Sequence, residues 1–170
     1  MSGTEKTKIF YWEACTYLAW LQNEEKAHGK DCIDALHRIA KDNFEKKNVI
    51  ITSTITFVEV LSSTLGEENE RKFRRSFRHQ DHIAYDVDPP IAMKAREFRD
   101  RFLKYKGGKT LSTPDAIHLA TAAIYKADEV WTLDNGQTDK KHLGLLELDG
   151  HEWADKLAIK RPHVDQPDLL

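Results

Sequence analysis

The sequence is poor in cysteine and has no long apolar run. Its 170 residues include only two cysteines, Cys15 and Cys32, and carry a formal net charge of −2 at pH 7. Two cysteines cannot form a disulfide framework, so we expect a reducing, cytoplasmic environment. No segment is apolar over the length of a membrane span, and the first residues lack a signal-peptide core, so we expect no membrane partner. Because the net charge is close to zero, any polyanionic partner must meet a local basic patch.

The chain also lacks internal repeats, low-complexity blocks and a long linker rich in proline or glycine. Its length is typical of one domain that is large enough to bury a core. We predict a single domain over residues 1–150 and a C-terminal tail over residues 151–170. The last twelve residues, 159–170, are polar and contain proline, so we expect them to be irregular.

Segments typical of strands alternate with segments typical of amphipathic helices. Strands are expected at residues 8–15, 48–53, 82–88, 129–134 and 145–149. Helices are expected around residues 17–21 and at 31–44, 54–65, 67–78, 91–105 and 112–123. This alternation predicts an α/β fold on a central, mainly parallel sheet. Ligands of such sheets bind beyond the carboxyl ends of the strands.

Four acidic residues lie at places that such a site would use. Glu13 and Asp134 lie at the exits of predicted strands, and Asp115 lies in the first turn of a helix with Thr113 as the expected N-cap. Glu59 lies in a helix that is apolar nearly all round, where a buried carboxylate is costly unless it is paired or bound to a metal.

Each acid also has a purely structural explanation. Asp115 is favoured by the helix dipole, and Glu13 is an ordinary polar residue at a strand end. Asp134 precedes Asn135 and Gly136 in a typical turn sequence, and Glu59 has many arginines with which to pair.

One hypothesis accounts for all four acids together, namely that they converge beyond one edge of the sheet. Crowded carboxylates take up protons unless a cation neutralises them. Oxygen ligands suit Mg²⁺ or Mn²⁺, which can activate a water molecule for attack on a phosphodiester. The pattern therefore predicts a metal-dependent nuclease.

The segments around the four acids, "FYWEACTYL", "STITFVEVL", "TPDAIHLATA" and "VWTLD", resemble the PIN-domain ribonucleases over residues 8–149. The resemblance implies a three-layer α/β/α fold, Mg²⁺- or Mn²⁺-dependent cleavage of RNA, and often a homodimer. Many short bacterial and archaeal members are toxins of the VapC type, each held inactive by an antitoxin protein.

Carried over to this sequence, the resemblance makes Glu13, Asp115 and Asp134 metal ligands, with Glu59 a ligand directly or through water. The hydroxyl of Thr132 is then expected to orient a carboxylate or a water molecule.

Two positions depart from the family pattern. Glu13 stands where the family usually has aspartate, and Cys15 stands where a small hydroxyl or amide residue is common. The longer side chain of Glu13 could displace or weaken the ion, since Mg²⁺ demands a strict geometry. The alternative function is therefore a PIN-fold module that binds RNA or protein without cleaving RNA.

A basic helix supplies the expected nucleic-acid contacts. The segment "RKFRRSFR" carries Arg71, Arg74, Arg75 and Arg78, which we predict to bind RNA phosphates. An acidic antitoxin segment could use the same surface, and a solvated face is the structural alternative. A second basic loop is expected at Lys104, Lys106 and Lys109.

Overall fold

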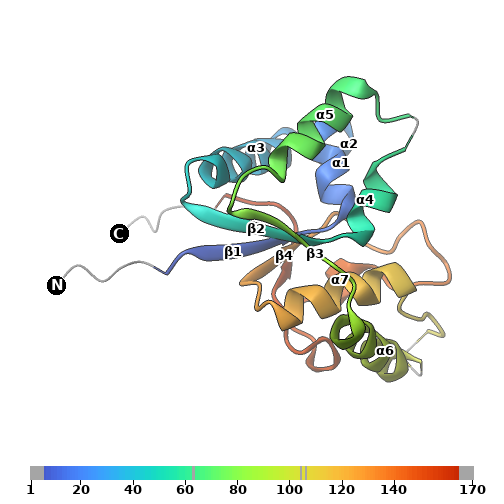
Figure 1. Ribbon diagram of the computed structural model, residues 1–170. Helices are drawn as coiled ribbons and strands as arrows, with labels where there is room; N and C mark the ends of the chain where they lie inside the picture. The colour runs from blue at the N-terminus through green and yellow to red at the C-terminus, as the bar shows by residue number, and fades with distance from the viewer. Residues whose placement is uncertain (1–5, 63, 104, 106, 165–170) are drawn as a thin grey trace, which may run out of the picture.

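The computed structural model describes residues 6–62, 64–103, 105 and 107–164 (Figure 1). Its centre is a five-stranded sheet in the order β3-β2-β1-β4-β5. All four strand pairs are parallel. The strands are β1 (Lys8–Trp12), β2 (Asn48–Ser53), β3 (His82–Tyr85), β4 (Glu129–Trp131) and β5 (Ile159–Lys160). The prediction of a parallel α/β sheet is confirmed.

Helices cover both faces of the sheet and make three layers. Figure 1 shows α1, α2, α3 and α5 on one side and α6 and α7 on the other. The first group is α1 (Ala14–Gln22), α2 (Glu25–His28), α3 (Lys30–Phe44) and α5 (Glu67–Ser76), and the second is α6 (Pro89–Phe102) and α7 (Thr113–Ile124). The short helix α4 (Ile55–Val60) follows directly after β2. The predicted α/β/α arrangement is therefore present.

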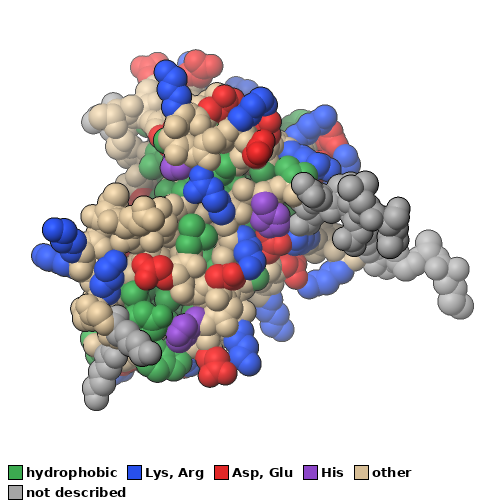
Figure 2. All heavy atoms as spheres, turned by 180° about the vertical axis from the view of Figure 1, so that it is seen from behind, with side chains coloured by type: hydrophobic (Ala, Val, Ile, Leu, Met, Phe, Trp, Pro, Cys, Tyr) green, Lys and Arg blue, Asp and Glu red, His purple; other side chains and the backbone are tan. Residues whose placement is uncertain are grey.

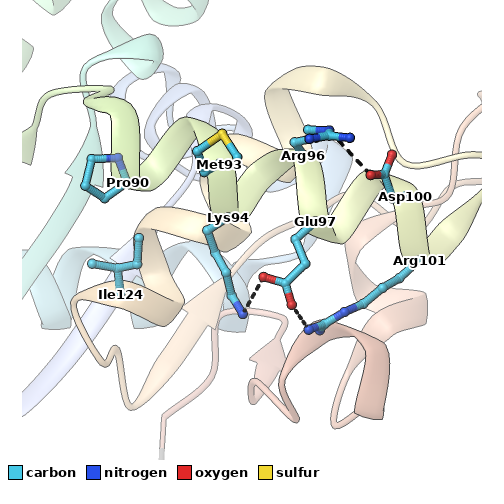
Figure 3. Close-up of a pocket in the computed structure, with 8 residues that line it drawn as sticks. All are labelled: Pro90, Met93, Lys94, Arg96, Glu97, Asp100, Arg101 and Ile124. Atoms are coloured by element: carbon cyan, nitrogen blue, oxygen red, sulfur yellow. Dashed lines mark hydrogen bonds and ion pairs between the residues drawn. The ribbon is translucent and has the colours of Figure 1, made fainter.

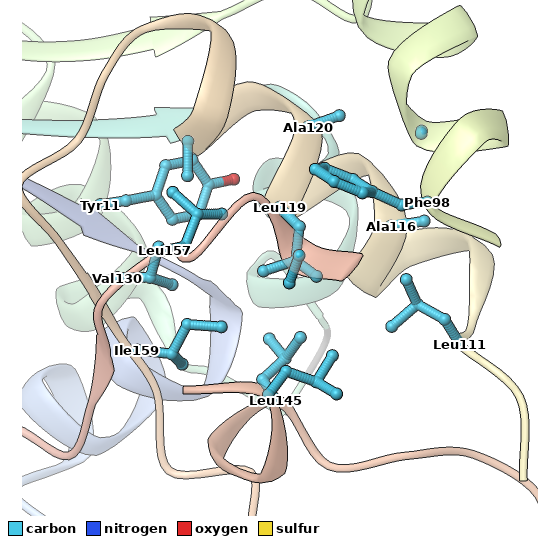
Figure 4. Packing of buried hydrophobic residues seen from close by; sticks show 14 of the residues in the cluster. Tyr11, Phe98, Leu111, Ala116, Leu119, Ala120, Val130, Leu145, Leu157 and Ile159 are labelled. Carbon is cyan, nitrogen blue, oxygen red and sulfur yellow. The ribbon is translucent and has the colours of Figure 1, made fainter. Parts of the chain in front are cut away.

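Side chains that alternate along the strands divide the core into two clusters. Phe10 and Trp12 of β1 pack against α1, α3 and α5, whereas Tyr11 packs against α6 and α7. Figure 4 shows the second cluster, in which Phe98 and Leu119 meet the sheet. Because side chains of a strand point alternately to opposite faces, a strand covered on both sides is apolar at every position.

The end of the chain differs from the prediction. Residues 145–149 are not a strand, because Leu145–Leu148 form the 3₁₀ helix η1 and bury two leucines three positions apart. A second 3₁₀ helix, η2, spans Glu152–Ala154. Ile159 and Lys160, which we expected in an irregular tail, instead form the edge strand β5 beside β4. A two-residue strand has too few positions to show any alternation in the sequence. Residues 165–170 lie outside the described part of the chain.

Two helices also begin or end at other residues than predicted. α4 ends at Val60 instead of reaching residue 65, and Val58 is 81% exposed. α7 is capped by Ser112, whose hydroxyl accepts a hydrogen bond from the backbone N–H of Asp115, and not by Thr113. Phe44 closes α3 with 66% of its surface exposed, whereas the apolar residues of an amphipathic helix are expected to face the core. Within the described residues, no helix combines the length and the apolar character that crossing a bilayer requires.

The buried position of Ile159 makes the end of the chain testable. Ile159 is 1% exposed, so Ile159→Ala should lower the free energy of unfolding by about 2–4 kcal/mol through lost burial and a residual cavity. The control Val164→Ala, at a side chain that is 38% exposed, should change it by less than about 0.5 kcal/mol. Urea unfolding followed by tryptophan fluorescence measures both. Equal stability of the Ile159 variant and the wild type would show that β5 adds nothing to the domain.

Candidate active site

The strand order defines one crevice at the carboxyl edge of the sheet. β1 lies between β2 and β4, and the chain leaves it through helices on one face but returns to β4 through α6 and α7 on the other. The carboxyl ends of β1 and β4 therefore form a topological switch point, where open α/β sheets bind ligands. The residues that follow these strands are Glu13 and the segment 132–134.

Strand register brings Glu13 and Thr132 together. Trp12 is paired with Trp131, so the next residue of each strand lies side by side. The Thr132 hydroxyl donates to Glu13 Oε1 at 2.9 Å and accepts a hydrogen bond from the Asp134 backbone N–H at 3.0 Å. One hydroxyl group thus links the segments that carry two of the predicted acids. That Thr132 orients a carboxylate for the chemistry of a site stays a prediction.

Glu13 is also the N-cap of α1. Its Oε2 accepts a hydrogen bond from the Cys15 N–H at 3.0 Å, and the Cys15 thiol donates to its Oε1. The thiol sulfur in turn accepts from the Leu133 N–H at 3.2 Å. Burial, and then the negative charge of Glu13, raises the pKa of the Cys15 thiol well above its ordinary value. Cys15 therefore stays protonated and donates to Glu13.

Asp115 is held by its own helix cap. Its backbone N–H donates to Ser112 Oγ, and the Ser112 hydroxyl donates to the Asp115 carboxylate. Burial raises the pKa of Asp115 to about 6, and the charges of Asp134 and Glu13 act in the same direction. The Ser112 hydrogen bond and the nearby His118 oppose this rise. Three carboxylates from distant parts of the chain therefore repel one another at this edge.

Asp134 serves the turn that follows it as well as the acidic cluster. Its Oδ1 accepts from the Gly136 N–H at 3.0 Å and its Oδ2 from the Leu145 N–H at 3.1 Å. Gly136 has a φ of 69°, and a β-carbon there would lie 2.6 Å from the backbone nitrogen of Gly144. The turn that we considered as an alternative is present, and its two backbone N–H groups fix the position of the carboxylate.

Glu59 pairs with a histidine and not with an arginine. His118 Nε2 lies 2.8 Å from Glu59 Oε2, and its Nδ1 lies 2.7 Å from the Tyr11 hydroxyl. Burial disfavours the charged imidazole, but the hydrogen bond and charge of Glu59 outweigh it, and the pKa of His118 is raised. The Glu59 side chain keeps 29% of its surface exposed. Glu59 thus joins the cluster through His118, which also feels the charges of Glu13 and Asp115.

The predicted RNA-binding arginines lie elsewhere. Arg71, Arg74, Arg75 and Arg78 belong to α5 and to the residues just after it, and Arg74 forms a 2.9 Å ion pair with Glu70. Among the described residues, no hydrogen bond or ion pair connects these arginines to the four acids. Lys104 and Lys106 lie outside the described residues, whereas Lys109 donates to the carbonyl of Gly136 at 3.0 Å. Lys109 thus lies beside the turn that follows Asp134.

Sequence reasoning did not find the parts played by Ser112, Tyr11 and Cys15. Ser112 stands three residues before Asp115, the spacing of an N-cap and its partner, so the sequence could have predicted this N-cap. Tyr11 carried no signal, because only the packing of α7 on the sheet brings His118 to its hydroxyl. A broad hollow of about 800 Å³ over α6, drawn in Figure 3, is lined by none of the four acids.

The donor chemistry of the cluster fits a hard divalent cation. All three converging side chains are carboxylates. The raised pKa of Asp115 indicates a crowding of negative charge that a cation would neutralise. In the described ranges, no three histidine, cysteine, aspartate or glutamate side chains are grouped closely enough to hold an ion by themselves. Mg²⁺ keeps several of its waters and is commonly bound through one or two carboxylates. Carboxylates that are too far apart to hold an ion by themselves are therefore compatible with Mg²⁺ binding.

Comparisons with known proteins agree with this geometry. The PIN domain family matches residues 32–143, a range that includes Glu59, Asp115 and Asp134. VapBC2 from Rickettsia felis, solved bound to a DNA fragment from its promoter, is similar with a TM-score of 0.58 and 16% identity, over 90% of this chain and 98% of that one. VapC20 from Mycobacterium tuberculosis, a toxin described as cleaving the sarcin-ricin loop, has a TM-score of 0.54 and 14% identity, over 74% and 90%. No curated protein sequence matches. On the family match and the shared fold, the chain belongs to the PIN-domain family.

Proposed function

We propose that this PIN-domain protein is an endoribonuclease that hydrolyses RNA phosphodiester bonds with the help of Mg²⁺ or Mn²⁺. The supporting observation is the group of mutually repelling carboxylates, Glu13, Asp115 and Asp134, at the switch point between β1 and β4. Acids that destabilise one another are expected where a cation is to be held. A bound divalent ion would supply charge neutralisation at the phosphate and a more acidic attacking water.

The chain's own side chains then have distinct tasks. Asp115 and Asp134 offer carboxylate oxygens from rigid supports, a helix N-terminus and a tight turn. Thr132 holds Glu13 in place, and His118 holds Glu59, which is proposed as a ligand directly or through water. Fixing the acids in this way reduces the rearrangement that binding requires.

The relatives suggest a biological setting. One is part of a VapBC assembly and another is a toxin that cleaves the sarcin-ricin loop. We therefore propose that this chain is the toxin of a toxin–antitoxin pair, with an antitoxin protein as partner and a homodimer as its assembly. The arginines at 71, 74, 75 and 78 remain the proposed contacts for RNA phosphates.

One observation favours a second candidate, the non-catalytic binding module. Glu13 is only 6% exposed, and its carboxylate already accepts hydrogen bonds from Thr132 and from both the backbone and the thiol of Cys15. An ion must compete with these donors for the same oxygens. Metal titration distinguishes the candidates, because the binding module needs no site that depends on Asp115 and Asp134.

Asp115→Asn should lower RNA cleavage by at least about 100-fold, because it removes a charged oxygen from the proposed ion site. Cleavage of a labelled RNA in Mn²⁺ measures the rate. Asp139→Asn is the matched control, since Asp139 is an exposed acid whose hydrogen bonds go to its own loop. The control should cleave RNA as the wild type does. Equal rates for both variants would show that Asp115 is not part of the ion site.

Asp115→Asn should also stabilise the fold in EDTA. A pKa raised to about 6 means that the folded state holds the Asp115 proton more tightly than the unfolded chain does. The stabilisation that the protonated Asp115 gives the folded state is complete at pH values below the ordinary aspartate pKa, and it is lost as the pH rises through about 6. At pH 7.5, Asp115→Asn should therefore raise the free energy of unfolding by about 1–3 kcal/mol relative to the wild type. A difference that does not grow between about pH 4 and pH 7.5 would mean that Asp115 titrates normally.

Glu13→Asp tests the departure from the family pattern. Aspartate is a better N-cap and matches the usual side-chain length, so the variant should bind Mn²⁺ more tightly and cleave RNA faster. Calorimetric titration with Mn²⁺ and the cleavage rate are the two measurements. Unchanged affinity and rate would mean that the fold accommodates the longer side chain.

A further inference from the structure

A separate groove lies between α3 and α5, on the face of the sheet opposite to α6 and α7. It encloses about 330 Å³ and is walled by Trp20, Phe44 and His79 among others. Phe44 is 66% exposed, and its ring meets the imidazole of His79 edge-on with a 4.8 Å separation of centroids. A phenylalanine with so much open surface beside a groove presents a flat apolar face for a ligand.

The groove is cationic. Lys41, Lys72 and Arg75 line it, and of the described residues that line it none is aspartate or glutamate. The Lys72 ammonium lies 4.1 Å above the ring of Trp20, so charge and aromatic surface are adjacent. Lys41 forms a long, exposed contact of 3.9 Å to Glu45, which neutralises it weakly. Charge complementarity therefore calls for an anionic ligand.

The positive charge continues along α5 beyond the groove. Arg71, Arg74, Arg75 and Arg78 together line an adjoining hollow of about 160 Å³, and Arg75 belongs to both hollows. Arg74 and Arg75 lie three and four residues after Arg71 and so share its face of the helix, and Arg78 follows the end of the helix at Ser76. A row of cations matches the repeating phosphates of a nucleic-acid strand better than a single small anion. Figure 2, which views the molecule from behind Figure 1, shows lysine and arginine mixed with acidic side chains on that face.

The polar groups of the wall already have partners within the protein. Asn43 donates to the carbonyls of Asn48 and Asp81 and contacts the imidazole of His82, and Ser76 donates to the carbonyl of Lys72. These side chains cannot read the edge of a base without giving up their own hydrogen bonds. Recognition in the groove would therefore use stacking and charge, the sequence-tolerant mode of single-strand binding.

We propose that this groove, the α3–α5 groove, is a second RNA-binding site that stacks an unpaired base on Phe44 and holds the flanking phosphates on Lys72 and Arg75. The choice of RNA rests on the proposed function. The groove borders Asn43 and His82, near the amino ends of β2 and β3, whereas the acids follow the carboxyl ends of β1 and β4. A strand length therefore separates the two sites, and the groove binds substrate away from the bond that is cleaved.

Binding of a fluorescein-labelled single-stranded oligoribonucleotide, followed by anisotropy in EDTA, tests the proposal. Phe44→Ala should weaken binding by about 5- to 100-fold, the effect of losing one stacked base, and Phe44→Trp should restore it. Arg75→Gln should weaken binding and reduce the slope of log affinity against log salt by about 0.7. Both substitutions should lower the affinity for adenine-rich and for uracil-rich oligonucleotides by similar factors.

Met93→Ala and Arg99→Gln are the matched controls, because both residues are exposed on α6. They should bind RNA within about two-fold of the wild type, as expected for surface positions outside the site. Wild-type affinity of Phe44→Ala would overturn the proposal. The proposal would also be overturned if Phe44→Ala weakened the binding of poly-L-glutamate and left RNA binding unchanged. The groove would then be a docking site for an acidic protein.

Cleavage kinetics separate this proposal from the proposed function. Because the groove acts away from the reacting bond, Phe44→Ala should raise KM and leave kcat unchanged. If RNA is bound through Phe44 but never cleaved with Mn²⁺, the nuclease proposal alone fails. If RNA is cleaved and KM is the same for Phe44→Ala, the groove proposal alone fails.

Discussion

The parallel pairing of β1 with β4 is the constraint on which the site depends. Trp12 faces Trp131 in register, so the residues immediately after them, Glu13 and Thr132, must lie within hydrogen-bond distance. A shift of one strand by one residue would turn its side chains to the other face of the sheet and separate Glu13 from Thr132. The two tryptophans are fully buried and their rings stack with an interplanar angle of 11°, so the core that stabilises the sheet also sets the position of the acids.

The acidic cluster works against the stability of the fold that holds it. Three carboxylates lie within electrostatic reach of one another, and burial adds to their cost, as the raised pKa of Asp115 reports. The protein offsets part of this cost locally, through the hydroxyls of Ser112 and Thr132, the thiol of Cys15 and the imidazole of His118. Uncompensated charge of this kind is common where a protein prepares a site for a ligand that is not part of its own chain.

The Glu59–His118 pair changes how the cluster is understood. From the sequence, a glutamate inside an apolar helix pointed to either a metal or an arginine. In the structure, α7 crosses the sheet so that His118 lies between Tyr11 and Glu59. The same helix therefore carries one acid of the cluster, Asp115, and the base that holds another. A helix N-terminus and its first full turn thus organise both sides of the site.

The sequence by itself determined the parallel α/β fold, because unbroken apolar strands and amphipathic helices leave few other ways to bury their surfaces. It also determined which acids stand at strand ends and helix starts, since those positions are properties of local sequence. Only the tertiary structure decided that Ile159 and Lys160 complete the sheet, that Glu59 meets His118, and that the arginines of α5 lie apart from the acids. Each of these features depends on contacts between segments far apart in the chain, and the local pattern of residues does not predict such contacts.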